Sequence, residues 1–431
     1  KAQMAKLFQK DRTNIGRHIS NIFKEKELDE KRKSLNEINE QFKGFELRET
    51  ELEKAIEEAK KEFGDRLFDF TEFWLNRGIH PEYGLGRLPS YFLNNPPNGK
   101  FVVPSNIDVV EKESIYFPPD SFNQLIIEDG VRIIENAAFY RMWGLKELNI
   151  PDSVIEIKEN AFANCINIEK VTLGKGLKIL DNSALSAFRK CNQIVLHEGL
   201  QKIGQHCFHL WEKLESITIP NSVTEMGPLA FFDCTSLKEA YIGDRLTYID
   251  RSCFKQCASL NKVRLPDSIM VINDEAFLDC TSLTTINLPE ELLTVGIQAF
   301  RNTLIGKVDL PSVVKIDVRA FEGCAALYSI NINDNCRVIG DYAFKDCIQL
   351  TELNLPSAMK YISWGLCENC TNLEQVTFGT NIEEIRSDAF KNCGDLIIYF
   401  EGTKEQWKKI YNSKAFTNTY FTVNCTDGKI V

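Results

Sequence analysis

An alanine-phenylalanine step recurs at an almost fixed interval along nearly two thirds of this chain. The interval is 23 residues throughout, except for one of 21 between Phe300 and Phe321. The second residue of each step is Phe139, Phe162, Leu185, Phe208, Phe231, Phe254, Phe277, Phe300, Phe321, Phe344, Cys367 and Phe390. Such a period is typical of a solenoid, in which each repeat buries its apolar face against its neighbours. Arrays of this kind bind partners more often than they catalyse reactions.

Each copy combines a short strand with a turn. In one copy Leu350, Leu353 and Leu355 alternate with polar residues, and Pro356 ends the strand because proline cannot donate to a ladder. In another copy the chain turns a corner, and Ala276 and Phe277 begin a short helical or turn segment. Stacked coils would place the strands about 4.8 Å apart in a parallel sheet. We expect about twelve copies over residues 117–398.

The cysteines follow the repeat rather than a disulfide pattern. Eight of the fourteen lie three residues after the step, at Cys165, Cys234, Cys257, Cys280, Cys324, Cys347, Cys370 and Cys393. Other copies place Met142, Phe188, Trp211 or Thr303 there, which indicates a buried and mostly apolar filler rather than a bonding partner. Reduced core thiols are therefore favoured over disulfides. The five histidines are scattered, so the sequence predicts no metal site.

The copies resemble the leucine-rich repeats of the BspA-like family. The segment LNKVRLPDSIMVINDEAF from Leu260 to Phe277 carries the strand, the proline, the corner and the alanine-phenylalanine step of that pattern. The resemblance covers residues 117–400 and implies a leucine-rich-repeat solenoid with a parallel sheet, here an α+β repeat protein. Residues 399–431 resemble the closing segment of such arrays, with Trp407 and Tyr411 spaced for one helix face. We expect this segment to form a C-terminal cap.

The outward-facing side chains of the strands are the ones that a ligand on the sheet would contact. Most copies place Thr or Asn at the central outward position, as a solvated sheet requires in any case. Three copies differ, with Tyr241, Arg264 and Asp309. Tyrosine and arginine are enriched in interface hot spots, so these three residues are a candidate partner-binding patch.

Residues 1–27 follow a different pattern. Asp11 can cap a helix in which Ile15, Ile19 and Ile22 form an apolar stripe, and this outline suits the second helix of a partial helix-turn-helix. The string DRTNIGRHISNIF resembles the helix-turn-helix of the RhuM-like virulence-associated family. The candidate DNA-contacting residues on the other face are Arg12, Thr13, Asn14, Arg17 and Ser20.

Residues 28–63 carry apolar residues at heptad spacing. Leu28, Leu35, Phe42 and Leu52 lie in one frame of positions a and d, which favours a coiled-coil helix that forms a homodimer. A single amphipathic helix folded onto the rest of the chain is the alternative. Residues 64–116 are rich in aromatic residues, glycine and proline, and we expect a linker and N-terminal cap there.

Charge and motif content limit the function. The net charge is -10, whereas residues 1–27 carry seven basic against three acidic residues, so the two ends suit different partners. The sequence has no eighteen-residue apolar stretch, no phosphate loop and no metalloprotease or hydrolase motif. It therefore predicts no membrane span, no cofactor and no enzyme. Because the chain begins at Lys1, we expect upstream residues to be missing, and the cytoplasm is favoured over the cell surface.

Three functions remain in view. The first is a non-enzymatic protein-protein recognition scaffold built on the solenoid. The second is a DNA-binding regulator that uses residues 1–27 and recruits a partner through the array. The third is a bacterial cell-surface adhesin.

Overall fold

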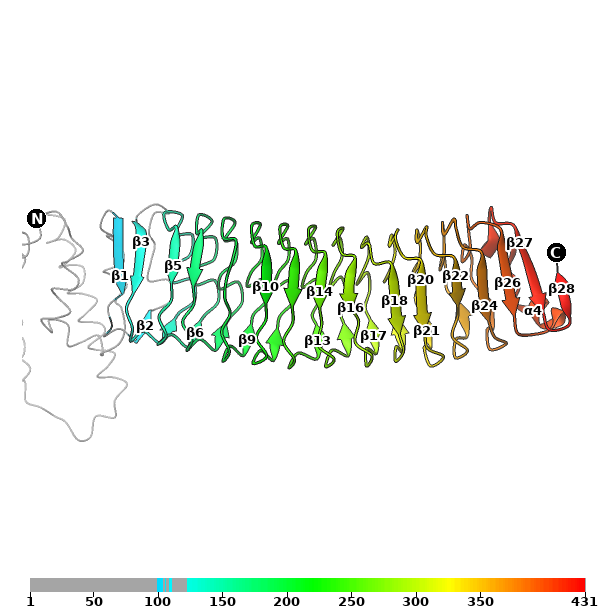
Figure 1. The fold of residues 1–431 in the computed structure, drawn as a ribbon, viewed down its shortest axis with the longest axis horizontal. Helices are drawn as coiled ribbons and strands as arrows, with labels where there is room; N and C mark the ends of the chain where they lie inside the picture. Colours follow the sequence, from blue (N-terminus) through cyan, green and yellow to red (C-terminus); the bar gives the residue numbers. More distant parts are fainter. Residues whose placement is uncertain (1–98, 104, 106–107, 111–121, 431) are drawn as a thin grey trace, which may run out of the picture. The chain divides into compact units, whose positions relative to one another are not determined.

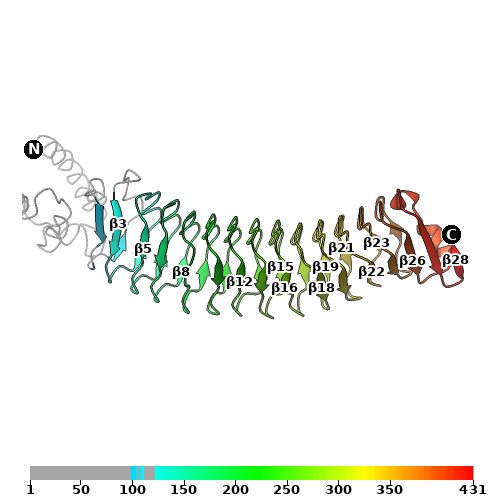
Figure 2. The ribbon, with the colours of Figure 1, turned by 45° about the horizontal axis from the view of Figure 1, so that its top comes forward.

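The chain divides into two units, Lys1–Phe73 and Trp74–Val431. The computed structural model describes residues 99–103, 105, 108–110 and 122–430, all of which belong to the second unit. These residues form a solenoid of stacked coils that bends gently along its length (Figures 1 and 2). The predictions for residues 1–27 and 28–63, and for most of 64–116, lie outside the described residues and stay predictions.

A column of parallel strands runs along one side of the solenoid and forms its main sheet (Figure 1). Its strands are β1 (Gly99–Val103), β3 (Phe122–Ile127), β5 (Glu147–Asn149), β7 (Lys170–Thr172), β10 (Ser216–Thr218), β12 (Glu239–Tyr241), β14 (Lys262–Arg264), β16 (Thr285–Asn287), β18 (Lys307–Leu310), β20 (Ser329–Ile332), β22 (Glu352–Asn354), β24 (Gln375–Phe378) and β26 (Leu396–Phe400). Corresponding residues of neighbouring copies pair directly, as Ala240 does with Val263. The inward residue of each strand is buried in nearly every copy.

A second column of two-residue parallel strands runs along another side. Within the described ranges it consists of β2 (Val109–Val110), β4 (Ile133–Ile134), β6 (Glu156–Ile157), β8 (Ile179–Leu180), β9 (Lys202–Ile203), β11 (Glu225–Met226), β13 (Tyr248–Ile249), β15 (Val271–Ile272), β17 (Thr294–Val295), β19 (Lys315–Ile316), β21 (Val338–Ile339), β23 (Tyr361–Ile362) and β25 (Glu384–Ile385). The second residue of each strand is buried and the first faces outward. β1 pairs with β3 and β2 pairs with β4, so both columns begin upstream of residue 117.

The main sheet is interrupted at several points, and two of them lie where the copies depart from the pattern. The coil between β7 and β10 has no main-sheet strand, although Ile194 occupies the position of the usual strand centre. The sheet also breaks between β16 and β18, within the 21-residue interval. There one residue is missing before Val308 and one after it, yet Val308 and Ile316 are both buried. The deletions therefore shorten the corners and leave the core positions filled.

The alanine-phenylalanine step forms the third side of each coil, and it is a turn rather than a helix. Ser252 and Gln256, two residues before and after Phe254, have positive φ angles of 54° and 62°. The amides of Ser252, Phe254 and Gln256 all donate to the next coil, to the carbonyls of residues 274, 276 and 278, over 2.9, 2.8 and 2.8 Å. These bonds offset the roughly 1–2 kcal/mol that a left-handed residue costs. A helix does not form here, because every second amide of the turn donates to the next coil, whereas the amides of a helix donate to carbonyls of the same helix.

The phenylalanine rings stack along the solenoid axis. The ring of Phe254 lies 5.3 Å from that of Phe231 and 5.5 Å from that of Phe277, measured between centroids, with the planes within 4° of parallel. The stack is continuous from Phe208 to Phe344 and every ring in it is fully buried. Each ring between Phe208 and Phe344 therefore has an aromatic neighbour in both adjacent coils, which ties these coils into one core.

The expected apolar filler after the step is in fact a hydrogen-bond donor. The thiol of Cys280 donates to the carbonyl oxygen of Phe254 in the previous coil over 3.1 Å. Six of the other cysteines at this position donate to the corresponding phenylalanine carbonyl, and Cys393 donates to the carbonyl of Cys367, all over 3.0–3.2 Å. Trp211 replaces the thiol with its indole Nε1, which donates to the carbonyl of Leu185. The position is buried and its cysteines form no disulfide, as predicted. Its preference for a hydrogen-bond donor was not predicted. All fourteen cysteines are free, as predicted.

The C-terminal cap completes the backbone bonding of the last coil. It consists of α4 (Lys404–Ile410), η2 (Ser413–Phe416), β27 (Phe421–Cys425) and β28 (Gly428–Ile430). The amides of Asp388, Phe390 and Asn392, which in earlier copies donate to the next coil, donate to carbonyls of residues 414, 415 and 417. Trp407 is the buried residue of α4. α4 and η2 are the helices found in the described residues. The α part of the predicted α+β class therefore depends on residues that the structure does not describe.

Removing one ring from the stack should destabilise the solenoid strongly. We expect Phe254→Ala to lower the free energy of unfolding by about 3–5 kcal/mol, because it leaves a cavity between Phe231 and Phe277. Urea unfolding monitored by circular dichroism measures the loss. Val195→Ala is the control, since Val195 is 65% exposed and truncating it should leave the unfolding midpoint unchanged. A small loss for Phe254→Ala would show that the stack is not a principal stabilising contact.

Native thiol reactivity provides a second test of the core. Burial raises the pKa of Cys165 and of Cys324 to about 12 and that of Cys336 to about 11, so these thiols stay protonated and inaccessible. Thirteen of the fourteen cysteines are buried and only Cys425 is partly exposed. We therefore expect Ellman's reagent at pH 8 to titrate one thiol in the folded protein and fourteen in urea. Rapid reaction of several native thiols would contradict the described packing.

Candidate recognition surfaces

The structure places two of the three predicted partner-binding residues side by side. Tyr241 on β12 pairs in register with Arg264 on β14, so their side chains project next to each other from the main sheet. Asp309 lies on β18, beyond Asn287 and across the break in the sheet. Asp309 instead accepts a hydrogen bond from Asn331 on β20 over 2.7 Å. The patch is therefore a close pair with a separate third residue.

Neighbouring side chains hold Tyr241 in place. Its hydroxyl donates to the carboxylate of Glu239, and the Lys262 ammonium lies 3.3 Å from the hydroxyl oxygen and 5.5 Å from the ring centroid. Arg264 is exposed beside it. Asn287 turns its amide onto the backbone of Leu265, donating and accepting one bond. This part of the main sheet is ordered by its own polar contacts before any partner binds.

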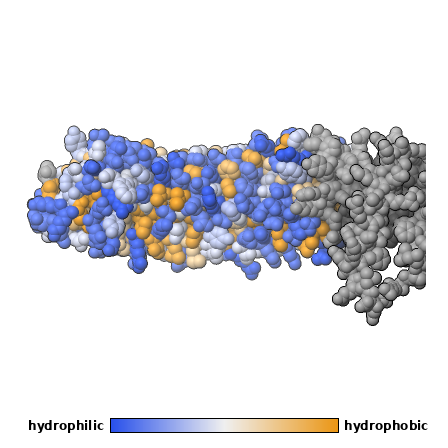
Figure 3. All heavy atoms as spheres, turned by 180° about the vertical axis from the view of Figure 1, so that it is seen from behind, coloured by the Kyte–Doolittle hydropathy of each residue, from blue (hydrophilic) through white to orange (hydrophobic). Residues whose placement is uncertain are grey.

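The column of short strands carries an apolar surface that the sequence analysis did not identify. Met270, Leu293 and Val314 occupy the same position in three consecutive coils and are 42%, 39% and 41% exposed. We call these three residues the apolar stripe. Figure 3 shows hydrophobic residues gathered over the middle of the array on the face turned away in Figure 1. The signal was available in the aligned copies, but a two-residue strand gives no alternation to draw attention to it.

A cluster of aromatic and arginine side chains lies further along the same column. The Arg386 guanidinium carbon is 4.2 Å from the centroid of the Trp364 ring and 5.1 Å from that of Tyr361. Trp364 and Tyr361 are both exposed, at 46% and 41%. We call these three residues the aromatic-arginine cluster. Stacking against two rings fixes the arginine, so the cluster is an ordered and partly apolar platform.

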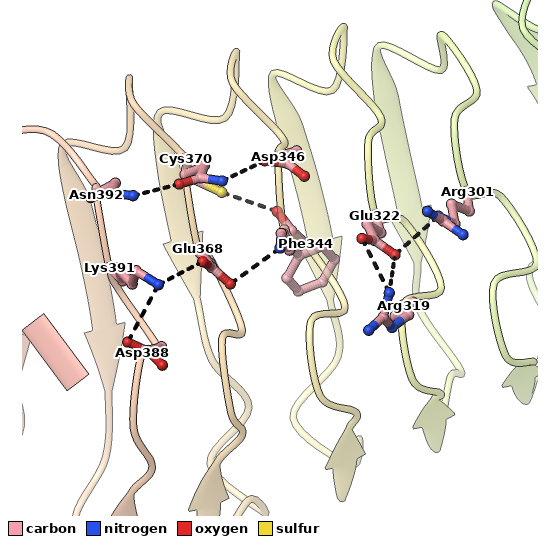
Figure 4. A network of polar contacts seen from close by, with 12 residues as sticks. Arg301, Arg319, Glu322, Phe344, Asp346, Glu368, Cys370, Asp388, Lys391 and Asn392 are labelled. Carbon is pink, nitrogen blue, oxygen red and sulfur yellow. Dashed lines mark hydrogen bonds and ion pairs between the residues drawn. The ribbon is translucent and has the colours of Figure 1, made fainter. Parts of the chain in front are cut away.

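Alternating charges follow the phenylalanine position in successive coils. The residues directly after it are Arg301, Glu322, Lys345, Glu368 and Lys391. Figure 4 shows how Glu322 lies against Arg301, and Glu368 against Lys391. The Arg301 Nε lies 3.0 Å from a Glu322 carboxylate oxygen, which Arg319 also approaches to 3.3 Å. Glu368 contacts both Lys345, at 3.3 Å, and Lys391, at 3.0 Å. These charges satisfy one another, so the ladder joins coils and leaves little charge for a ligand.

Few side chains that could support chemistry lie close together in the described residues, and those that do form no metal site. In the part of the chain that the structure describes, no three His, Cys, Asp or Glu residues are arranged to hold a metal ion. The HCFH run places the rings of His206 and His209 at 5.2 Å, and burial, together with the charges of His206 and Arg189, lowers the pKa of His209 to about 4. A shallow hollow of about 570 Å³ lies beside the missing strand and is lined by charged and polar residues, Lys213 and Glu215 among them.

The repeat geometry has a counterpart in a known family. The model of the BspA-type leucine-rich repeat region matches residues 110–231, 201–325 and 298–422, which together span most of the chain. The chain belongs to the BspA-type leucine-rich repeat family. The family resemblance predicted from the repeats is thereby confirmed. The matched range does not include residues 1–27, for which the RhuM-like resemblance has no further support.

Solved structures of bacterial leucine-rich repeat proteins resemble this family member. A leucine-rich repeat protein from Bacteroides ovatus is 22% identical, with 75% of this chain and 92% of that chain covered and a TM-score of 0.47. A leucine-rich cell surface protein from Faecalibacterium prausnitzii is 21% identical, with 74% and 94% covered and a TM-score of 0.40. The pneumococcal vaccine antigen PcpA is 17% identical, with 75% and 78% covered and a TM-score of 0.42. A search of curated protein sequences found no match.

The charge ladder of this BspA-type array should make its stability depend on pH. Burial opposes ionisation of Glu368, but its hydrogen bond to Lys391 and the charge of Lys345 lower its pKa. A lowered pKa stabilises the folded state above the ordinary pKa of glutamate and loses that contribution as the pH falls through the folded value. We expect Glu368→Gln to cost about 1–3 kcal/mol at pH 7. The difference from the original protein should close below about pH 4.

Urea unfolding at pH 7 and pH 3 measures this difference. Glu383→Gln is the matched control, because Glu383 forms an exposed pair with Lys360 that solvent screens. An equal effect of the two substitutions at pH 7 would show that the partly buried ladder contributes no more than a surface ion pair.

Proposed function

We propose that this protein is a non-enzymatic protein-protein recognition scaffold. The BspA-type solenoid supplies two regular faces whose backbones bond mainly between neighbouring coils. What distinguishes one coil from the next is therefore its outward side chains. A partner protein that spans several coils would contact a unique combination of them.

The aromatic-arginine cluster is the observation that supports this proposal most strongly. Tryptophan, tyrosine and arginine are the residue types that dominate binding energy in protein interfaces. Trp364, Tyr361 and Arg386 expose apolar area on a platform that their mutual stacking has already ordered, so binding them would cost little side-chain entropy. An exposed tryptophan has no evident role in the stability of a solenoid.

Tyr241 and Arg264 remain a second proposed contact region on the main sheet. Their register and the bonds that hold Tyr241 support a joint role. Asp309 would take part only in an interface that extends four strands along the main sheet, from β12 to β18. The two regions lie on different sides of the coils, so one partner could use either region without the other.

The other functions depend on what lies outside the described residues. DNA binding by Arg12, Thr13, Asn14, Arg17 and Ser20, and a homodimer through residues 28–63, stay predictions. Location in the cytoplasm or at the cell surface, with an adhesin role, is likewise untested. Within the described residues, no helix is both long and apolar enough to cross a bilayer.

Quantitative affinity capture tests the scaffold proposal. The full chain and its Trp364→Ala, Arg264→Ala and Val195→Ala variants would each be immobilised and exposed to proteins of the source cells and their surroundings. We expect at least one protein to be captured by the original chain and by Val195→Ala, and to be lost with Trp364→Ala or Arg264→Ala. Captured sets that are identical for all four chains would contradict the proposal.

A further inference from the structure

The apolar stripe is a continuous surface rather than three scattered residues. The Leu293 amide donates to the Met270 carbonyl over 2.8 Å, and the Val314 amide donates to the Leu293 carbonyl over 2.9 Å. Direct backbone bonding places the three side chains in neighbouring coils at the spacing of parallel strands, about 4.8 Å. Single exposed apolar residues are ordinary on protein surfaces, whereas a contiguous row needs an explanation.

An acidic edge runs along one side of the apolar stripe. Asp244, Asp267 and Glu290 occupy one repeat position, three residues before Thr247, Met270 and Leu293 respectively. Glu291 follows Glu290, and all four acidic side chains are exposed. None of them takes part in the ion pairs found among the described residues. This edge therefore differs from the charge ladder, whose members neutralise one another, and its negative potential is available to a partner.

The spacing of the apolar stripe suits a helix lying along the solenoid axis. Apolar residues on one face of an amphipathic helix recur every three or four residues, which at 1.5 Å per residue is about 5 Å. That step is close to the rise of one coil. On one face of an extended strand the side chains lie roughly 6.6–6.8 Å apart. That spacing no longer matches the rise of the coils after three coils.

We infer that the apolar stripe and its acidic edge bind an amphipathic helix of a partner protein, with lysine or arginine residues beside the apolar face of that helix. This inference rests on the proposed scaffold function and names the chemistry of one partner segment. Apolar contacts to Met270, Leu293 and Val314 supply most of the affinity, while Asp267, Glu290 and Glu291 set the orientation of the helix and speed its association.

The acidic edge also argues against other occupants. A second copy of the array would bring the same acidic residues to a twofold contact, where like charges repel. An anionic lipid surface would be repelled in the same way. A basic amphipathic segment is the occupant that satisfies both the apolar stripe and its charged border.

The probe for this site is a fluorescein-labelled 18-residue peptide of leucine and lysine, with leucine on one helical face. Its binding to the full chain is measured by fluorescence anisotropy at low and physiological salt. A peptide of the same composition, scrambled to distribute leucine around the helix, controls for charge alone. A third peptide with glutamate in place of lysine tests the acidic edge. We expect the ordered lysine peptide to bind about tenfold more tightly than either control, equivalent to about 1.4 kcal/mol.

Variants locate the binding site. Leu293→Lys should weaken binding by about tenfold or more, because it removes the central apolar contact and adds repulsion. Val195→Lys is the matched control, since it makes the same chemical change at an exposed valine on the main-sheet side and should leave affinity unchanged. Should Leu293→Lys fail to fold, Asp267→Asn/Glu290→Gln keeps the fold and should weaken binding at low salt.

Equal binding of the ordered and scrambled peptides would overturn the inference, and so would equal effects of Leu293→Lys and Val195→Lys. The capture experiment with Trp364→Ala is independent of the peptide comparison and of the Leu293→Lys comparison. If captured proteins still depend on Trp364 while the peptides show no order dependence, the helix site is wrong and the scaffold function stands. If no capture depends on either region but the peptide results are positive, the helix site stands without the aromatic-arginine cluster.

Discussion

The contact between one alanine-phenylalanine step and the next is the constraint on which the rest of this structure depends. Left-handed residues on both sides of each phenylalanine turn three amides toward the following coil. The same geometry stacks the rings at centroid distances of 5.0–5.9 Å from Phe208 to Phe344. A buried thiol then donates to the phenylalanine carbonyl of the preceding coil. One position thus supplies the backbone bonds, the aromatic packing and the side-chain hydrogen bond that fix the coil spacing.

That spacing is what gives the surface its order. Because every coil repeats the same backbone, outward residues of consecutive copies form columns with a constant separation. A column of threonine and asparagine makes the main sheet polar, and a column of Met270, Leu293 and Val314 makes a stretch of the other sheet apolar. Opposite charges in one column neutralise each other, as Glu368 does with Lys345 and Lys391. Recognition therefore resides in the copies where a column changes character.

The sequence predicted the features that each copy repeats. The period, the strand with its terminal proline, the buried phenylalanine and the free thiols all follow from residue type at a fixed position. It did not predict the donor role of Cys280, because a cysteine at that position suits a small buried filler as well as a hydrogen-bond donor. Nor did it predict the stacking of Arg386 on Trp364, which joins residues of adjacent coils. Asp309 was grouped with Tyr241 in the sequence analysis because the two residues lie within four copies of each other. The main sheet breaks between β16 and β18, so Asp309 lies beyond the break.

Hydrogen exchange measured residue by residue on the folded protein tests the central role of the alanine-phenylalanine contact most directly. The amides of Ser252, Phe254 and Gln256 lie in turns, yet each donates to the next coil. The account predicts that they exchange as slowly as the amide of Val263 in the centre of β14, because opening either requires separating two coils. Exchange of the three turn amides at the rate of an exposed loop, with the strand amide still protected, would contradict it.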